Sequence, residues 1–270
     1  MMGLAIMGLI DPPGYISDGR ILLGEDRIDP NPAAFRGSGV SMIFQDPQTS
    51  LNPLRSIGSQ LVETIERHNK VSRSEAIAQA HRALEEVNIN SDRFHAYPHV
   101  LSGGMRQRVV IALALACDPK LIIADEPTTA LDVTVQAQIL DLLKSLCRAR
   151  ETSVLLITHD MGVIAKTADR VAVLYAGRLA EIGPTSDVLG QPKHPYTQGL
   201  MASTPKIDPG NVDRKLHQIH GAMPRLDSLP SGCAFHPRCD VAVEKCHSQQ
   251  PPLWRERASC WHLEKMEPPS

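Results

Sequence analysis

Short apolar runs alternate with longer amphipathic stretches through the first two thirds of the chain. The runs are rich in branched and aromatic residues, which predicts strands at residues 21–28, 40–44, 121–124 and 154–158. The run at 121–124 is apolar at every position, as expected for a strand that is buried on both faces of a sheet.

Helices are predicted between these strands. Apolar residues recur at helical spacing over residues 59–87, and a second helix is expected from Ser102, as its N-cap, to about residue 117. A third helix is expected at 133–148 and a short one through 163–164. Because strands and helices alternate, the chain is predicted to be an α/β protein with a parallel sheet that is covered by helices.

Two further strands, 171–175 and 179–182, are predicted to form an antiparallel pair. Beyond about residue 190, proline becomes frequent and the hydrophobic periodicity fades. The expected organisation is one large domain at 1–190, with a helical subdomain at about 46–118, and a small irregular module at 191–270.

Composition limits the classes of function. The 270 residues carry a formal net charge of −2, with 42% hydrophobic and 21% charged residues. This is ordinary globular composition, and it lacks the strongly basic character that usually accompanies nucleic-acid binding. No run reaches the roughly 20 apolar residues of a membrane helix, and the apolar start lacks the basic residues and cleavage site of a signal peptide. Any association with a membrane is therefore expected to run through partners.

The strand at 121–124 leads directly into two acidic residues, Asp125 and Glu126. Ligands of open α/β proteins bind at the carboxyl ends of the strands, where this pair is expected to lie. One carboxylate can associate with Mg²⁺ and the other can orient an attacking water molecule. The alternative interpretation is a solvated strand end without catalytic function.

The sequence LSGGMRQR at 101–108 is a more specific signal. Ser102, Gly103 and Gly104 at a helix start expose backbone N–H groups at the positive end of the helix dipole, which favours anion binding. Taken alone, the same residues are also compatible with an ordinary serine N-cap followed by two flexible glycines.

Together these segments resemble the ABC-type nucleotide-binding domain, over most of the chain from Met1 to about Gly190. LSGG-x-x-Q-R is the signature motif of that family, and residues 121–126 match its Walker B strand. The resemblance implies a P-loop NTPase-like fold that binds ATP and Mg²⁺. It implies that Asp125 is the Mg²⁺-associated acid and that Glu126 is the general base.

The remaining motifs follow in the family's order. His159 matches the switch histidine that contacts the γ-phosphate, and Gln45 matches the Q-loop glutamine that touches Mg²⁺ and reports the nucleotide state. Asp132 lies in the match to the D-loop, which crosses the dimer interface. The resemblance implies a catalytic role for Glu126 and His159, and nucleotide contacts for Gln45, Ser102, Gly103, Gly104, Gln107 and Asp132.

Longer segments narrow the resemblance to the oligopeptide and dipeptide importers. FQDPQTSLNP at 44–53, DEPTTALDVT at 125–134 and HPYT at 194–197 are similar to that branch, as is the cysteine-bearing tail. Nickel importers share much of the first two segments, so the tail favours peptides over nickel. An ABC-type ATPase of DNA repair is disfavoured, because only 56 residues separate Gln45 from Ser102 and no coiled-coil heptads are visible.

The implied function is ATP hydrolysis coupled to peptide import across the bacterial inner membrane. The implied partners are two transmembrane permeases, a second homologous ATPase in a nucleotide-sandwich dimer and, indirectly, a periplasmic peptide-binding protein. No nucleic acid is expected. The subunit would lie peripherally on the cytoplasmic face of the membrane, and the transported peptides would be selected by other components.

One family motif does not occur in the chain. ABC ATPases carry G-x-x-x-x-G-K-[ST], whose N–H groups and lysine hold the phosphates, whereas this chain has no Gly-Lys pair and its first lysine is Lys70. Its first residues resemble the helix that follows this loop, so the chain is expected to begin just after it. Hydrolysis by these residues alone is therefore not expected, and a non-catalytic assembly subunit is the rival hypothesis.

Four of the six cysteines occur in the tail with the spacing C-x5-C-x6-C-x13-C. This spacing does not fit the C-x2–4-C pairs of common zinc modules, whereas iron–sulfur clusters tolerate varied spacing. Tails of this kind in peptide-importer ATPases are reported to hold such a cluster. The candidate ligands are Cys233, Cys239, Cys246 and Cys260. Zinc, with nearby histidines, and four free thiols are the alternatives.

Overall fold

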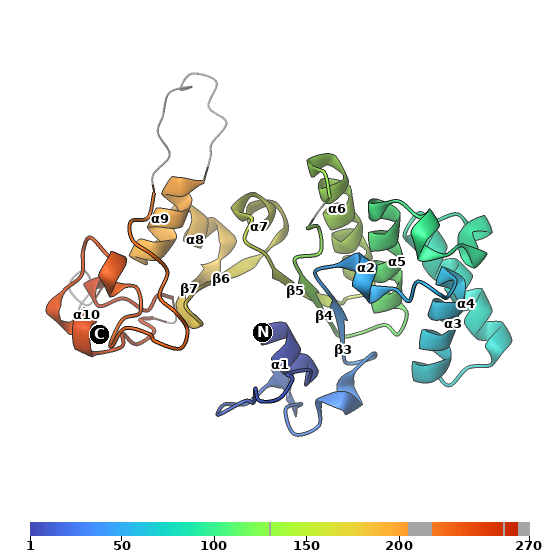
Figure 1. Cartoon of the computed structure of the whole chain (residues 1–270), viewed down its shortest axis with the longest axis horizontal. Helices are drawn as coiled ribbons and strands as arrows, with labels where there is room; N and C mark the ends of the chain where they lie inside the picture. Colours follow the sequence, from blue (N-terminus) through green and yellow to red (C-terminus); the bar gives the residue numbers. More distant parts are fainter. Residues whose placement is uncertain (130, 205–217, 256, 264–270) are drawn as a thin grey trace, which may run out of the picture. The chain divides into compact units, whose positions relative to one another are not determined.

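The computed structural model describes residues 1–129, 131–204, 218–255 and 257–263 (Figure 1). The chain forms two compact units, Met1–His159 and Asp160–Ser270. In the described ranges, no helix combines the length and apolar character that crossing a membrane requires.

A three-stranded parallel sheet lies at the centre of the first unit, in the order β3-β4-β5. The strands are β3 (Val40–Ile43), β4 (Leu121–Asp125) and β5 (Ser153–Ile157). Ala124 of the central strand pairs with Ile43 on one side and Leu156 on the other. β4 is buried along its middle, as predicted from its apolar sequence, and the parallel arrangement is confirmed.

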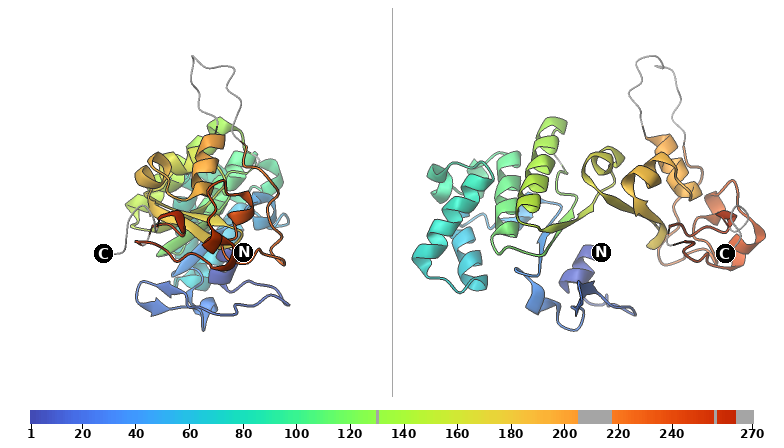
Figure 2. Two further views of the ribbon diagram at one scale, coloured as in Figure 1. Left: turned by 90° about the vertical axis from the view of Figure 1, so that its left-hand side faces the viewer. Right: turned by 180° about the vertical axis from the view of Figure 1, so that it is seen from behind.

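Four long helices accompany this sheet, and their starts are encoded locally. They are α3 (Ile57–His68), α4 (Arg73–Glu86), α5 (Gly103–Leu115) and α6 (Val133–Ala149). Each begins after a side chain that accepts a backbone N–H bond: Ser56, Ser72, Ser102 and Asp132. α3 and α4 lie side by side in Figure 1 and in the right-hand view of Figure 2. The helical stretch predicted at 59–87 is therefore two helices.

The first 28 residues form a short helix and a small hairpin. α1 (Met2–Met7) ends at Gly8, whose φ of +62° suits a glycine C-cap. The prediction of one strand at 21–28 is wrong. These residues instead form a hairpin of two short strands, β1 (Leu22–Leu23) and β2 (Asp26–Arg27). Gly24 has a φ of +62°, and this left-handed conformation reverses the chain.

Short elements complete the first unit. They are η1 (Pro32–Phe35), α2 (Pro47–Ser50), η2 (Ser91–His95) and η3 (Pro98–Val100).

The second unit is built around the antiparallel pair β6 (Arg170–Tyr175) and β7 (Arg178–Pro184), which confirms the predicted pairing. Its other elements are α7 (Met161–Thr167), α8 (Thr185–Gly190), α9 (Pro195–Ser203), η4 (His236–Arg238) and α10 (Glu244–Ser248).

The tail packs against this hairpin rather than forming a separate module. Ile182 donates its N–H to the Arg257 carbonyl (2.7 Å), and Ser259 donates to the Ala180 carbonyl (2.8 Å), so tail residues lie along the edge of β7. Phe235 of the tail shares an apolar core with Tyr175. The tail and the hairpin thus belong to one compact unit, and the domain organisation expected at 1–190 and 191–270 stays a prediction.

Glu181 anchors the second unit from the inside. It is fully buried, and its two carboxylate oxygens accept the backbone N–H groups of Lys193 and His194, both at 2.9 Å. We expect Glu181→Ala to lower the free energy of unfolding by about 2–4 kcal/mol, because two buried donors lose their acceptor. Denaturant unfolding of the full chain measures this, with exposed Glu244→Ala as the control. Equal stability of the two variants would contradict the anchoring role.

Candidate functional site

Asp125 and Glu126 lie at the carboxyl end of β4, where the sequence predicts them. Glu126 has a φ of +47°, a left-handed conformation that is uncommon for residues other than glycine. Its N–H donates to the Ile157 carbonyl at 2.9 Å, which ties the end of β4 to the end of β5. The chain therefore turns sharply at the candidate base while this residue stays attached to the sheet.

Three side chains surround the Glu126 carboxylate. Gln45 Nε2 lies 2.9 Å from Oε2, and Thr129 Oγ1 donates to the same oxygen at 3.0 Å. His159 Nδ1 lies 2.9 Å from Oε1. The structure thus brings together three residues that are far apart in the sequence, Gln45, Glu126 and His159, because β3, β4 and β5 are neighbours that end at one sheet edge.

These contacts favour the charged form of Glu126. The hydrogen bond with His159 is the largest cause of a lowered pKa of this carboxyl, and the bonds from Thr129 and Gln45 act in the same direction. Partial burial opposes them. The hydrogen bonds therefore stabilise the carboxylate form of this side chain and fix its orientation. The His159 side chain is 81% exposed, so it can reach a group outside the protein.

The signature segment lies at the start of α5. The Ser102 hydroxyl accepts the Met105 N–H at 3.3 Å, which confirms the predicted N-cap. Gly104 is required by packing, since a Cβ there would lie 2.8 Å from Cγ1 of Val135 on α6. Ser102 is exposed, whereas Gln107 is 1% exposed and its Nε2 has no hydrogen-bond partner among the described residues. The side chain of Gln107 is thus buried in the core. The nucleotide contact predicted for this residue stays a prediction.

Asp132 is the N-cap of α6. Its Oδ1 accepts the N–H groups of Thr134 (3.1 Å) and Val135 (2.9 Å). The residue predicted to contact nucleotide thus has a structural role of its own.

Thr129, whose hydroxyl bonds to Glu126, was not predicted from the sequence. The sequence signal that could have identified it is a hydroxyl-bearing residue three positions after Glu126, close enough to contact that carboxylate within one turn.

The four tail cysteines lie near one another in the second unit. The Cys233 N–H donates to the Cys246 carbonyl at 2.9 Å. Burial raises the pKa of Cys239 to about 11, and the nearby thiols of Cys260, Cys233 and Cys246 add to this shift. However, no three histidine, cysteine or acidic side chains in the described residues are grouped closely enough to hold a metal ion. The predicted ligand set is therefore not confirmed.

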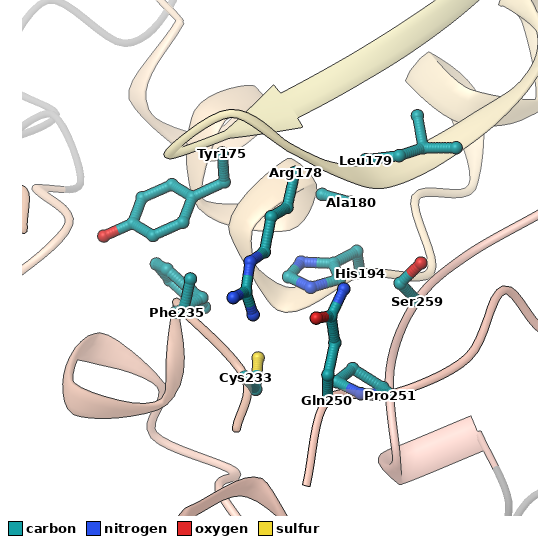
Figure 3. Close-up of a pocket in the computed structure, with 11 residues that line it drawn as sticks. Tyr175, Arg178, Leu179, Ala180, His194, Cys233, Phe235, Gln250, Pro251 and Ser259 are labelled. Atoms are coloured by element: carbon teal, nitrogen blue, oxygen red, sulfur yellow. The ribbon is translucent and has the colours of Figure 1, made fainter. Parts of the chain in front are cut away.

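A pocket lies between the β6–β7 hairpin and this tail (Figure 3). Arg178 extends from the hairpin towards Cys233 and Phe235, and its Nη1 donates to the Gly232 carbonyl at 3.0 Å. His194 is buried, which lowers its pKa to about 4, and its Nδ1 accepts the Tyr196 N–H. The Arg178 bond therefore fastens the tail to the hairpin, whereas His194 caps the start of α9.

Comparisons with known proteins agree on one family. Residues 3–129 match the ABC transporter family, and residues 180–246 match the family described as oligopeptide/dipeptide transporter, C-terminal region. The oligopeptide transport ATP-binding protein AppD of Bacillus subtilis (strain 168) is 49% identical over 257 residues, covering 93% of this chain and 78% of AppD. The oligopeptide transport ATP-binding protein OppD of Salmonella typhimurium is 47% identical, covering 92% of this chain and 75% of OppD.

Two solved structures are similar in fold. One is the dimeric post-hydrolysis state of the ATP-binding cassette MJ0796 bound to ADP and Pi, with a TM-score of 0.57 and 27% identity over 68% of this chain and 79% of MJ0796. The other is cbiO1 from Clostridium perfringens, part of the ABC transporter complex cbiONQ, with a TM-score of 0.60 and 26% identity over 70% of this chain and 74% of cbiO1.

The capping role of Asp132 can be separated from any role of its charge. We expect Asp132→Ala to lower the free energy of unfolding by about 1 kcal/mol, because two N–H groups at the start of α6 lose their acceptor. Asp132→Asn should stay close to wild type, since asparagine caps as well as aspartate. Thermal unfolding measures both variants, and an equal loss in both would contradict the capping explanation.

Proposed function

The chain belongs to the family of ATP-binding subunits of ABC-type oligopeptide and dipeptide transporters, and on this premise we propose that the cluster around Glu126 performs its ATP hydrolysis. The family, the ABC-type fold and the coupling of ATP hydrolysis to peptide import agree with the prediction from sequence. The nickel alternative is not favoured. The observation that carries the proposal is the convergence of Gln45, Glu126 and His159 at one sheet edge.

Each residue of the cluster has a proposed role. Glu126 accepts a proton from the attacking water, a role supported by the orientation of its carboxylate by three hydrogen bonds. Asp125 associates with Mg²⁺, which neutralises charge on the phosphates when it is bound. His159 and Gln45 exchange their contacts with Glu126 for contacts with the nucleotide, a role supported by the exposure of both side chains.

The signature segment acts on a second site. ABC ATPase subunits of importers work with membrane permeases and as dimers. We propose that Ser102, Gly103 and Gly104 present their N–H groups to ATP that is held by a second, homologous ATPase. Asp132 lies at this same interface, at the exposed start of α6. Gln107 supports the segment from within the core.

The partners are two transmembrane permeases and, indirectly, a periplasmic peptide-binding protein. Phe44, next to Gln45, is 38% exposed and is a candidate contact for a permease. The subunit associates peripherally with the membrane, and we propose the cytoplasmic face of the inner membrane as its location. Because the 270 residues contain no Gly-Lys pair, activity is best tested on a subunit that also carries the family's phosphate-binding loop.

The decisive variant is Glu126→Gln in such a subunit, assembled with its permeases in lipid vesicles. The amide keeps the shape of the side chain but cannot accept a proton, so ATP hydrolysis should fall by about 10²–10⁴-fold while ATP still binds. Phosphate release and binding of a fluorescent ATP analogue measure the two properties.

Glu25→Gln, at an exposed turn glutamate, is the matched control and should hydrolyse ATP at the wild-type rate. Wild-type turnover in Glu126→Gln would move the base elsewhere. Failure of the subunit to co-purify with permeases would contradict the assembly. The 270-residue chain could also be tested without the added loop. If it supports ATP-driven peptide uptake only when a competent partner ATPase is present, the non-catalytic role is favoured.

We further propose that Cys233, Cys239, Cys246 and Cys260 hold an iron–sulfur cluster. The proposal is supported by the thiol chemistry of this donor set and by the neighbouring thiols that raise the pKa of Cys239 and of Cys260. Zinc is the alternative metal, with His236 and His247 beside the cysteines.

Metal content of the full chain tests this cofactor. After anaerobic purification, we expect iron and acid-labile sulfide with visible absorbance, and we expect Cys246→Ser to lose both. Cys147→Ala is the control, because Cys147 is a buried cysteine of the first unit. Zinc without iron would identify the alternative, and four titratable tail thiols without metal would contradict both.

A further inference from the structure

Thr129 belongs to the same turn as the candidate base. Its N–H donates to the Glu126 carbonyl at 3.2 Å, and its hydroxyl donates to Glu126 Oε2 at 3.0 Å. Backbone and side chain of Thr129 thus both contact Glu126. The turn also contains Pro127, which is buried and limits the backbone conformations available there.

The three partners of the carboxylate differ in where they come from. Gln45 follows β3 and His159 follows β5, so each lies on a segment of the chain that is separate from the turn of Glu126. Thr129 is only three residues away in one turn. If Gln45 and His159 leave the carboxylate to contact nucleotide, the Thr129 hydroxyl stays within reach of Oε2.

The two carboxylate oxygens are therefore not equivalent. Oε2 is bonded by Thr129 and Gln45, whereas Oε1 is bonded by His159 alone. Departure of His159 frees Oε1, and departure of Gln45 leaves Oε2 bonded by Thr129. A carboxylate that is held through one oxygen keeps its direction while the other oxygen accepts a proton.

We propose that Thr129 is a positioning residue for ATP hydrolysis, holding Oε2 of Glu126 so that Oε1 faces the attacking water. This inference rests on the proposed role of Glu126 as base. In the step, the water O–H bond breaks and its proton moves to Oε1. The water oxygen bonds to the γ-phosphorus as the bond to the β–γ bridging oxygen breaks, and ADP and phosphate result.

The test compares Thr129→Val and Thr129→Ser in the complete transporter. Valine keeps the branched shape but removes the hydroxyl, and we expect kcat to fall about tenfold with KM unchanged, because the lost bond orients the base and does not bind substrate. Serine restores the hydroxyl and should restore kcat. Thr128→Val is the matched control, since no side-chain hydrogen bond of Thr128 occurs in the described part of the turn.

A second measurement does not depend on hydrolysis. Unfolding midpoints of Thr129→Val, Glu126→Gln and the double variant should be non-additive, because the two side chains contact each other. Additive midpoints, wild-type kcat in Thr129→Val, or failure of serine to rescue would overturn the role of Thr129 while leaving Glu126 as the base. A wild-type transporter that hydrolyses no ATP would overturn the proposed function, and this role with it.

Discussion

The pairing of β4 with β3 on one side and β5 on the other is the constraint on which the site depends. All three strands run in the same direction, so their carboxyl ends meet at one edge of the sheet. The segments that follow them carry Gln45, Glu126 and His159. The N–H of Glu126 also bonds to the Ile157 carbonyl, so the proposed base is attached to the end of β5 through its backbone.

The same constraint distinguishes Glu126 from the residues that bond to its carboxylate. Glu126 is fixed by the sheet and by a turn that includes Thr129, whereas Gln45 and His159 begin segments that leave the sheet. Hydrogen bonds with these two residues orient the carboxylate and lower its pKa. On the function proposed above, Gln45 and His159 would exchange these bonds for contacts with nucleotide, and this exchange would link nucleotide arrival to the position of the segments that they begin.

The second unit is stabilised by packing between its hairpin and the tail. Its hairpin is too small to bury an adequate core, and the tail supplies the missing apolar surface through Phe235, packed against Tyr175 and Tyr196. Backbone bonds from the tail to Ala180 and Ile182 extend the sheet edge. The tail cysteines therefore lie in a segment that is already held to the hairpin by packing and hydrogen bonds.

Much of the fold could be predicted from the sequence, because the responsible signals are local. Apolar strands, serine and aspartate caps and helical periodicity depend on neighbouring residues, and the motif order identified the family. The hairpin at Leu22–Arg27 was missed because branched residues on both sides of Gly24 resemble one continuous strand. The packing of Phe235 against Tyr175 could not be predicted either, because it joins residues sixty positions apart.

The sequence by itself determined which residues could carry out the chemistry, namely an acidic pair after a buried strand and a serine-glycine helix start. Only the tertiary structure decided how they are arranged: that one oxygen of Glu126 is bonded by His159 and the other by Gln45 and Thr129, and that Gln107 faces the core. Motif letters specify functional groups and their order along the chain. Hydrogen bonding depends on distances between segments, and those distances are set by strand pairing and side-chain packing.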